Sequence, residues 1–198
     1  LVVAFWLSGV LSNSALSLLD HRFRARPPLP PSKDIVIVAI DEFSLHAYKQ
    51  WPWPRAVHAA LIDRLTKAGA KMIALDIVFD QPSREGETAD DDALAAAIAR
   101  SGRVVLPVFF EEQLAGAGVQ STKALRAIGI LEEAAGGKEG HICFTPDPGG
   151  TLRRLRPFVY DPLRNAPVPA FSRVSACQLL GVPGPDPARW AGRRPLAV

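Results

Sequence analysis

The sequence lacks the short motifs that mark the commonest catalytic sites. No GxGxxG dinucleotide motif, P-loop, GxSxG nucleophile turn or HExxH zinc motif occurs in its 198 residues. Cysteine is scarce, and Cys143 and Cys177 form no CxxC pair, which argues against a structural zinc site. The four histidines show no metal-ligand spacing either. We expect two buried free thiols, with a disulfide in an oxidising compartment as the alternative, and we predict no cofactor.

Negative charge is scarce near the end of the chain. Residues 151–198 carry eight arginines and two aspartates, whereas residues 34–100 carry seven basic and eleven acidic side chains. A basic surface of this kind can bind nucleic acid or a membrane. The arginines lie among prolines, however, without the interleaved aromatic residues that stack on bases. We therefore expect no nucleic-acid partner, and an arginine-rich surface that pairs with the acidic half.

Charged residues are missing altogether from residues 1–19. This is about the length that crosses a bilayer, which needs roughly 20 apolar residues. The end of a transmembrane helix, the apolar core of a signal peptide and a soluble packing helix all fit. We favour the transmembrane helix, although five polar residues weaken it. Because the sequence does not begin with methionine, we expect it to be a piece of a longer protein.

A basic, proline-rich stretch follows at residues 20–33. Three arginines come first, and four prolines stand between Pro27 and Pro31. Proline-rich segments are extended and semi-rigid, so we predict a connector between the membrane segment and a domain that covers residues 34–198. By the positive-inside rule the arginines favour the cytoplasmic side, unless charges upstream of residue 1 outweigh them.

Two apolar segments frame the predicted core. Residues 35–40 are typical of a strand buried on both faces, and residues 72–75 indicate a second strand. An apolar stripe at helical spacing lies between them, with Pro54 placed for the first turn and Gly69 for the end. The stripe consists of Val57, Leu61, Leu65 and Ala68. Strand, helix and strand form a βαβ unit of a parallel sheet.

The pattern continues beyond this unit. Three aspartates open a predicted helix over residues 90–102, and residues 104–110 form a third strand. Residues 111–136 are weakly helical in pattern. The order β-α-β-α-β predicts the first half of a layered α/β fold.

The C-terminal part predicts antiparallel structure. Residues 140–145 and 152–160 flank a Pro/Gly-rich turn and are typical of a hairpin. Residues 168–180 form a final helix that ends at Gly181. The expected fold is therefore α/β: a layered β-α-β-α-β core with a mostly parallel sheet, plus a C-terminal antiparallel hairpin and helix.

Acidic residues gather where the predicted strands end. Asp41 and Asp76 follow the first two strands, Asp80 comes shortly after, and this edge is where open α/β sheets bind ligands. Converging carboxylates bind a cation or a metal, or hold a proton. Alternatively, each acid caps a turn or pairs with an arginine such as Arg55 or Arg153. Because a helix start disfavours a cation, we expect Arg55 to pair with Asp41 or Asp76.

Two tryptophans stand two residues apart in the run WPWPR. Trp51 and Trp53 lie in a proline-held segment and should project to the same side. They form either an aromatic wall that stacks a ligand or holds a cation, or a hydrophobic lid over one end of the sheet. The lid is slightly favoured.

Several of these segments together resemble one known family. IVAIDEFSL, WPWPR, AGAKMIALDIVF, DDDALAAAI followed by VVLP, and the later GHICFTPDPGGTLRR occur in this order. The chain resembles the second type of CHASE domain over roughly residues 20–180. CHASE domains are cyclase/histidine-kinase-associated sensory extracellular domains of bacterial receptors.

The resemblance implies a sensory domain that faces the periplasm or cell exterior and is not itself an enzyme. It implies an output through an adenylate or guanylate cyclase, a histidine kinase or a protein kinase. The expected partners are an unknown small molecule or physical stimulus, the inner membrane through the N-terminal helix, and a second copy of the chain. The predicted ligand residues are those at the acidic edge: Asp41, Asp76, Asp80, Trp51, Trp53, Arg55 and Arg153. A hydrolase that uses the strand-end acids around a divalent metal is the alternative.

Overall fold

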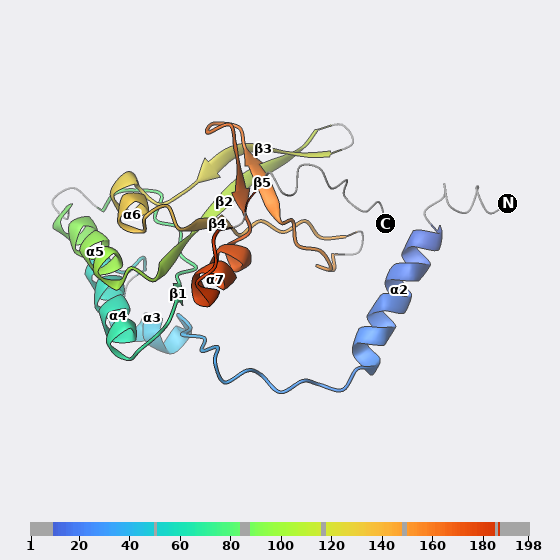
Figure 1. Cartoon of the computed structure of the whole chain (residues 1–198), viewed down its shortest axis with the longest axis horizontal. Helices are drawn as coiled ribbons and strands as arrows, with labels where there is room; N and C mark the ends of the chain where they lie inside the picture. The colour runs from blue at the N-terminus through green and yellow to red at the C-terminus, as the bar shows by residue number, and fades with distance from the viewer. Residues whose placement is uncertain are drawn as a thin grey trace. The chain divides into compact units, whose positions relative to one another are not determined.

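The computed structural model describes residues 10–49, 51–83, 88–115, 118–147, 150–184 and 186. These fall into two compact units, divided between residues 49 and 50. The first contains helix α2 (Val10–Ala25), an extended segment and the short helix α3 (Glu42–Tyr48) (Figure 1). Within the described residues, no helix combines the length and apolar character needed to cross a membrane.

Residues 35–40 are not a strand. They are extended but unpaired in any ladder, and their side chains are exposed, from 86% for Ile37 to 37% for Ile40. The prediction of a buried strand here was wrong. A strand forms only when it pairs with a neighbouring strand. The described part of the first unit contains no strand that residues 35–40 could pair with.

The second unit is built on a four-stranded sheet. Strand β2 (Val104–Ala115) lies at its centre, with β1 (Ile73–Ala74) and β4 (Glu139–His141) both parallel to it. Strand β3 (Gly118–Leu125) pairs antiparallel with the later part of β2. This sheet, with the separate hairpin described below, confirms the α/β fold with a mostly parallel sheet. The helical pattern assigned to residues 111–136 was wrong for half of this range, which β2 and β3 occupy, whereas a helix forms only near its end.

Three helices and one face of the sheet enclose the larger core. Helices α4 (Arg55–Lys67) and α5 (Thr88–Ser101) lie side by side (Figure 1), and α6 (Gly129–Ala134) packs next to α5. The core joins buried residues of all three helices to β1 and β2, among them Ile62, Leu94, Ile98, Leu106 and Leu131. The buried face of α4 carries His58, Ala59 and Ile62. It is therefore centred one residue further around the helix than the predicted stripe. Gly69 follows the helix with φ of 88°, as predicted for its end.

The C-terminal hairpin differs from the one predicted. It pairs β5 (Phe158–Asp161) with β6 (Ala166–Pro169), and Asn165 takes the left-handed conformation in its turn, with φ of 51°. Residues 140–141 instead join the main sheet through β4, because their backbone groups pair in parallel with β2. Helix α7 (Phe171–Leu180) follows and ends at Gly181, as predicted.

Helix α7 begins in very close contact with β4. A Cβ atom on Gly140 would lie 2.5 Å from the Cα of Phe171, and His141 forms a parallel bridge with Ala170. A second buried cluster joins the sheet to the hairpin through Val108, Phe110, Cys143, Val159 and Val168. Gly140 is therefore required by packing, because no side chain fits between the two backbones.

Candidate functional site

The predicted acids are divided between the two units of the structure. Asp41 caps α3, where the backbone N–H of Ser44 donates to its Oδ1 at 2.9 Å. The hydrogen bonds from Ser44 lower the pKa of Asp41 below its ordinary value. Asp41 belongs to the first unit and Asp76 to the second, so their convergence stays a prediction. Asp76 is exposed, and Asp80 lies beside the side-chain amide of Gln81 at 3.5 Å.

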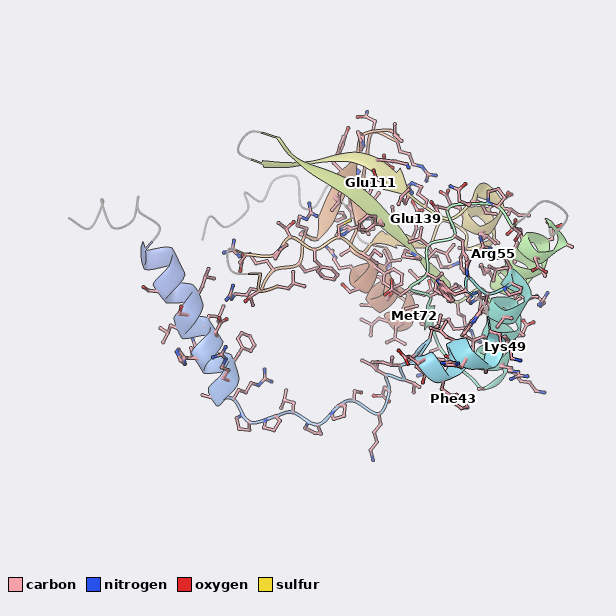
Figure 2. The ribbon with its side chains drawn as sticks, turned by 180° about the vertical axis from the view of Figure 1, so that it is seen from behind. Phe43, Lys49, Arg55, Met72, Glu111 and Glu139 are labelled. Carbon is pink, nitrogen blue, oxygen red and sulfur yellow. The ribbon has the colours of Figure 1, made fainter. Side chains whose placement is uncertain are left out.

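Arg55 pairs with an acid, as predicted, but with a different one. Its Nε donates to Oδ1 of Asp91 at 3.2 Å, and its Nη2 donates to the carbonyl of Gln81 at 2.8 Å. Figure 2 labels Arg55 among the side chains. The guanidinium also lies over the ring of Phe79, 4.3 Å from its centre. The prediction of Asp76 as the partner was therefore wrong, and a contact with Asp41, which belongs to the other unit, stays a prediction. Asp91 reaches Arg55 because α5 packs alongside α4.

Asp91 is a buried carboxylate with several donors. Both the backbone N–H and the hydroxyl of Ser83 donate to it at 2.8 Å, in addition to Arg55. Burial acts to raise the pKa of Asp91, but these hydrogen bonds and the charge of Arg55 outweigh it and hold the pKa below the ordinary value. The acid is therefore ionised and serves as the anchor of Arg55.

The two tryptophans begin a row of four aromatic rings that continues through His58 to Phe79. Trp53 is buried, Trp51 is half exposed, and their rings meet edge to face at 5.6 Å. Trp53 then packs 5.8 Å from His58, whose ring meets Phe79 at 5.3 Å. Burial, with a smaller contribution from Arg55, lowers the pKa of His58. The arrangement fits the lid interpretation, since Trp53 is part of the packed interior.

Arg153 lies in a separate contact. Its Nη1 donates to Oδ2 of Asp147 at 3.2 Å, and both side chains are largely buried. Its role as a ligand residue stays a prediction. The two cysteines are free thiols, as expected: Cys143 is buried and Cys177 is half-buried.

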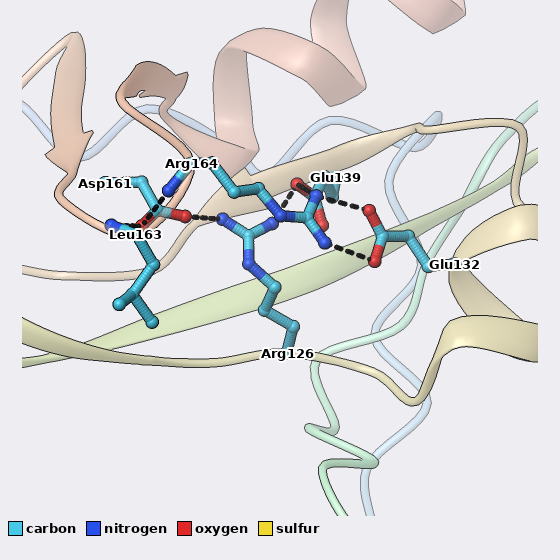
Figure 3. A network of polar contacts seen from close by, with 6 residues as sticks. All are labelled: Arg126, Glu132, Glu139, Asp161, Leu163 and Arg164. Atoms are coloured by element: carbon cyan, nitrogen blue, oxygen red, sulfur yellow. Dashed lines mark hydrogen bonds and ion pairs between the residues drawn. The ribbon is translucent and has the colours of Figure 1, made fainter.

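A larger charged network was not anticipated from the sequence (Figure 3). Arg126 pairs with Glu139 and with Asp161, and all three side chains are nearly buried. Arg164 forms a bidentate ion pair with Glu132, in which Nη2 of Arg164 lies 2.7 Å from Oε2 of Glu132. Arg164 also approaches Glu139 at 3.4 Å. The network joins the segment before α6, α6 itself, β4 and the hairpin.

The network orders the hairpin as well as balancing charge. Asp161 accepts hydrogen bonds from the backbone N–H groups of Leu163 at 2.9 Å and Arg164 at 3.2 Å. Burial acts to raise the pKa of Asp161, but these bonds and Arg126 bring it below the ordinary value. The hydrogen bond from Arg164 likewise lowers the pKa of Glu132. Both acids therefore stay ionised in the folded protein.

A cavity of about 410 Å³ adjoins this network. Side chains from the network line one part of it, namely Arg126, Glu139 and Arg164, together with Lys138. Residues of β6 and α7, including Val168, Val174 and Cys177, line the rest. Its volume lies in the range of small-molecule sites, roughly 300–1,000 Å³.

Comparison with known proteins assigns the family. The family model described as CHASE2 domain matches residues 1–187. The chain belongs to the CHASE2 family. No match was found among the curated proteins or among the solved structures. CHASE2 is a sensory extracellular domain of signalling receptors and is not catalytic, which agrees with the resemblance found in the sequence.

The geometry of this CHASE2 domain gives no support to the metal-dependent hydrolase. Across the residues that the structure describes, no three or more His, Cys, Asp or Glu side chains are grouped so as to hold a metal ion. The acids that the hydrolase would use are a helix cap, an exposed residue and a loop residue. The carboxylates that do gather in the CHASE2 domain are matched with arginines instead.

Sequence reasoning missed the charged network for a physical reason. Its members come from positions 126 to 164 and from four different segments. No spacing rule links them, and only the sheet and hairpin bring them together. The one available signal was the arginine excess of residues 151–198, which predicted pairing with acids elsewhere without naming them.

Proposed function

We propose that this CHASE2 domain is the extracytoplasmic sensory input module of a bacterial transmembrane receptor. The family match over residues 1–187 carries the proposal. The cavity beside the charged network supports it, because a sensor of a dissolved stimulus needs a site that a small molecule can enter. The catalytic output module belongs to another part of the receptor.

The proposed organisation follows the sequence. Residues 1–19 form the end of an N-terminal transmembrane helix, residues 20–33 a connector and residues 34–198 the sensor. The absence of charge from residues 1–19 supports the first part. The arginines of the connector then lie on the extracytoplasmic side of the membrane, against the positive-inside rule.

The proposed partners are a stimulus outside the cell, the inner membrane and a second copy of the chain. The output is an adenylate or guanylate cyclase, a histidine kinase or a protein kinase. A signal then passes from the sensor through its membrane segments to the output module.

Reporter fusions in the full-length receptor test the orientation. Alkaline phosphatase, which is active only outside the cytoplasm, and a green fluorescent protein that matures only inside it are each joined after Asp186. We expect active phosphatase and no fluorescence. Fluorescence with inactive phosphatase would place the domain in the cytoplasm and overturn the proposal.

A further inference from the structure

The lining of the cavity beside the charged network combines apolar and charged residues. The apolar ones come mainly from β6, α7 and the loop after α7, and include Val168, Val174 and Val182. The charged ones include Lys138 and Arg164. A ligand that matches both kinds of residue must have an apolar body and a charged end.

The sign of that charge follows from the lining. Three cationic side chains and one carboxylate face the cavity: Arg126, Lys138, Arg164 and Glu139. The other two carboxylates of the network, Glu132 and Asp161, do not line it. The charges of the network and Lys138 balance overall, but three cations and only one of the three carboxylates line the cavity, so the side of the network that faces the cavity is positive. Because a partly enclosed site weakens screening by water, an anion is favoured there over a cation or a neutral group.

Two of the cations have donors that a ligand can use. Arg126 already holds two carboxylates and is nearly buried. Lys138 donates to the carbonyl of Ala135 at 3.0 Å, which uses one of the three hydrogens of an ammonium group. The contact between Arg164 and Glu139, at 3.4 Å, is a long one for an ion pair with a hydrogen bond. An incoming anion therefore competes with Glu139 for Arg164.

We propose that this cavity binds a small organic anion, a carboxylate with an apolar body. Its carboxylate is held by Lys138 and Arg164, and its apolar body packs against Val174 and Val182. The ligand then bridges β4, the hairpin and α7. That this binding constitutes a signal rests on the sensory function proposed above.

The two cysteines provide the measurement. Cys177 lines the cavity and is half-buried, whereas Cys143 is only 4% exposed. The full chain, held in detergent micelles, is treated with N-ethylmaleimide, and modification of each thiol is followed by mass spectrometry. Cys177 then reports occupancy of the cavity, and Cys143 reports folding in the same sample.

We expect hexanoate and benzoate to slow modification of Cys177 by about tenfold or more at saturation, with Cys143 unreactive throughout. The neutral and cationic analogues 1-hexanol and hexylamine should leave the rate unchanged. Equal protection by all four compounds would overturn the choice of an anion. No protection by either carboxylate, with Cys143 still unreactive, would overturn the site itself. Protection by inorganic phosphate equal to that by hexanoate would overturn the requirement for an apolar body.

Substitutions locate the anion. Arg164→Gln and Lys138→Gln should each raise the hexanoate concentration for half-protection by about tenfold, because each removes a charged donor. Glu139→Gln should lower it, because it removes the competing carboxylate. Arg100→Gln, in an exposed ion pair with Asp63, is the control and should change nothing. If Arg164→Gln exposes Cys143 by unfolding, Lys138→Gln carries the test alone, and unchanged protection in it would refute the assignment.

The failure of this inference and that of the proposed function can be told apart. The labelling measurement is made without a membrane barrier, so its result does not depend on which side the domain faces. The reporter fusions do not depend on any ligand. Active phosphatase fusions combined with no protection of Cys177 by a carboxylate would overturn the anion site and leave the sensory function standing.

Discussion

At the scale of single residues, Arg55 is fixed by a complete set of contacts. Asp91 accepts from its Nε at 3.2 Å, the carbonyl of Gln81 from its Nη2 at 2.8 Å, and Phe79 lies 4.3 Å beneath it. The first turn of α4 is an unfavourable place for a cation. These contacts outweigh that cost and tie α4 both to α5, through Asp91, and to the segment before it.

Asp91→Ala should therefore destabilise the domain strongly. The Arg55 and Asp91 side chains are only 12% and 8% exposed, and removing one member of a buried pair costs about 3–5 kcal/mol. Asp76→Ala, at an exposed acid, should change the free energy of unfolding by less than about 0.5 kcal/mol. Urea denaturation measures both. Comparable losses in the two variants would mean that Arg55 depends on Asp76 after all.

His58 gives the domain a predictable response to pH. Its ring is buried between Trp53 and Phe79, and burial lowers its pKa. Between the folded pKa and the unfolded value of about 6.5, only the unfolded chain binds the proton. Stability therefore rises with pH through this window and falls on acidification, by at most about 1.4 kcal/mol per pH unit.

His58→Phe should remove this part of the pH dependence. The comparison is the free energy of unfolding of wild type and variant from pH 5 to pH 7.5, with the exposed His46→Phe as control. The wild type and the control should show the steeper slope. An unchanged slope in His58→Phe would show that other groups cause it.

At the scale of elements, the start of α7 rests directly on β4. A Cβ at Gly140 would come within 2.5 Å of the Phe171 Cα and 2.7 Å of its backbone nitrogen. Backbone atoms cannot move aside as a flexible side chain can. The contact therefore fixes the position of α7, which forms one wall of the cavity.

Gly140→Ala should displace α7 and cost at least about 1–3 kcal/mol, the usual range for overpacking. Gly129→Ala is the matched control, because an added Cβ there meets nothing within 4 Å and Gly129 opens α6. Alanine in a helix should be neutral or stabilise by up to about 1 kcal/mol. Thermal unfolding of the two variants measures the difference. A normal melting temperature for Gly140→Ala would contradict the close packing.

Elements with local signals could be predicted from the sequence. The apolar segment 72–75 contains β1, and the apolar segment 104–110 forms the first part of β2. Helix α5 has its acidic start and α7 its Gly181 end. Pairing partners could not be predicted in the same way. The turn near Pro146 suggested a hairpin there, but residues 140–141 pair with β2 instead.

The contacts of the candidate site also separate into those that nearby residues predict and those that depend on long-range packing. The sequence predicted that Arg55 needs an acid, because this follows from its place at a helix start. It left the tryptophans open between a wall that binds a ligand and a lid over packed structure. It did not predict Asp91 as the partner, since that depends on α5 packing against α4. The network around Arg126 needed the same long-range information, because Glu139 and Asp161 meet only once β4 and the hairpin are in place.

At the scale of the whole molecule, the connector should carry the signal. Four prolines between Pro27 and Pro31 make the segment stiff. Replacing these prolines with Gly and Ser should leave the domain folded but uncouple it from the output of the receptor. Circular dichroism checks folding, and the output activity in membranes checks coupling. Unchanged signalling in this variant would refute a transmitting role.

If an organic anion in the cavity drives the receptor, occupation of the cavity and output activity must change together. The most direct measurement follows Cys177 protection and output activity together, in membranes containing the full-length receptor, while hexanoate is titrated. We predict that the output changes over the same hexanoate range in which Cys177 becomes protected, and that Arg164→Gln shifts both curves together to higher concentration. Full protection of Cys177 with an unchanged output would contradict the account.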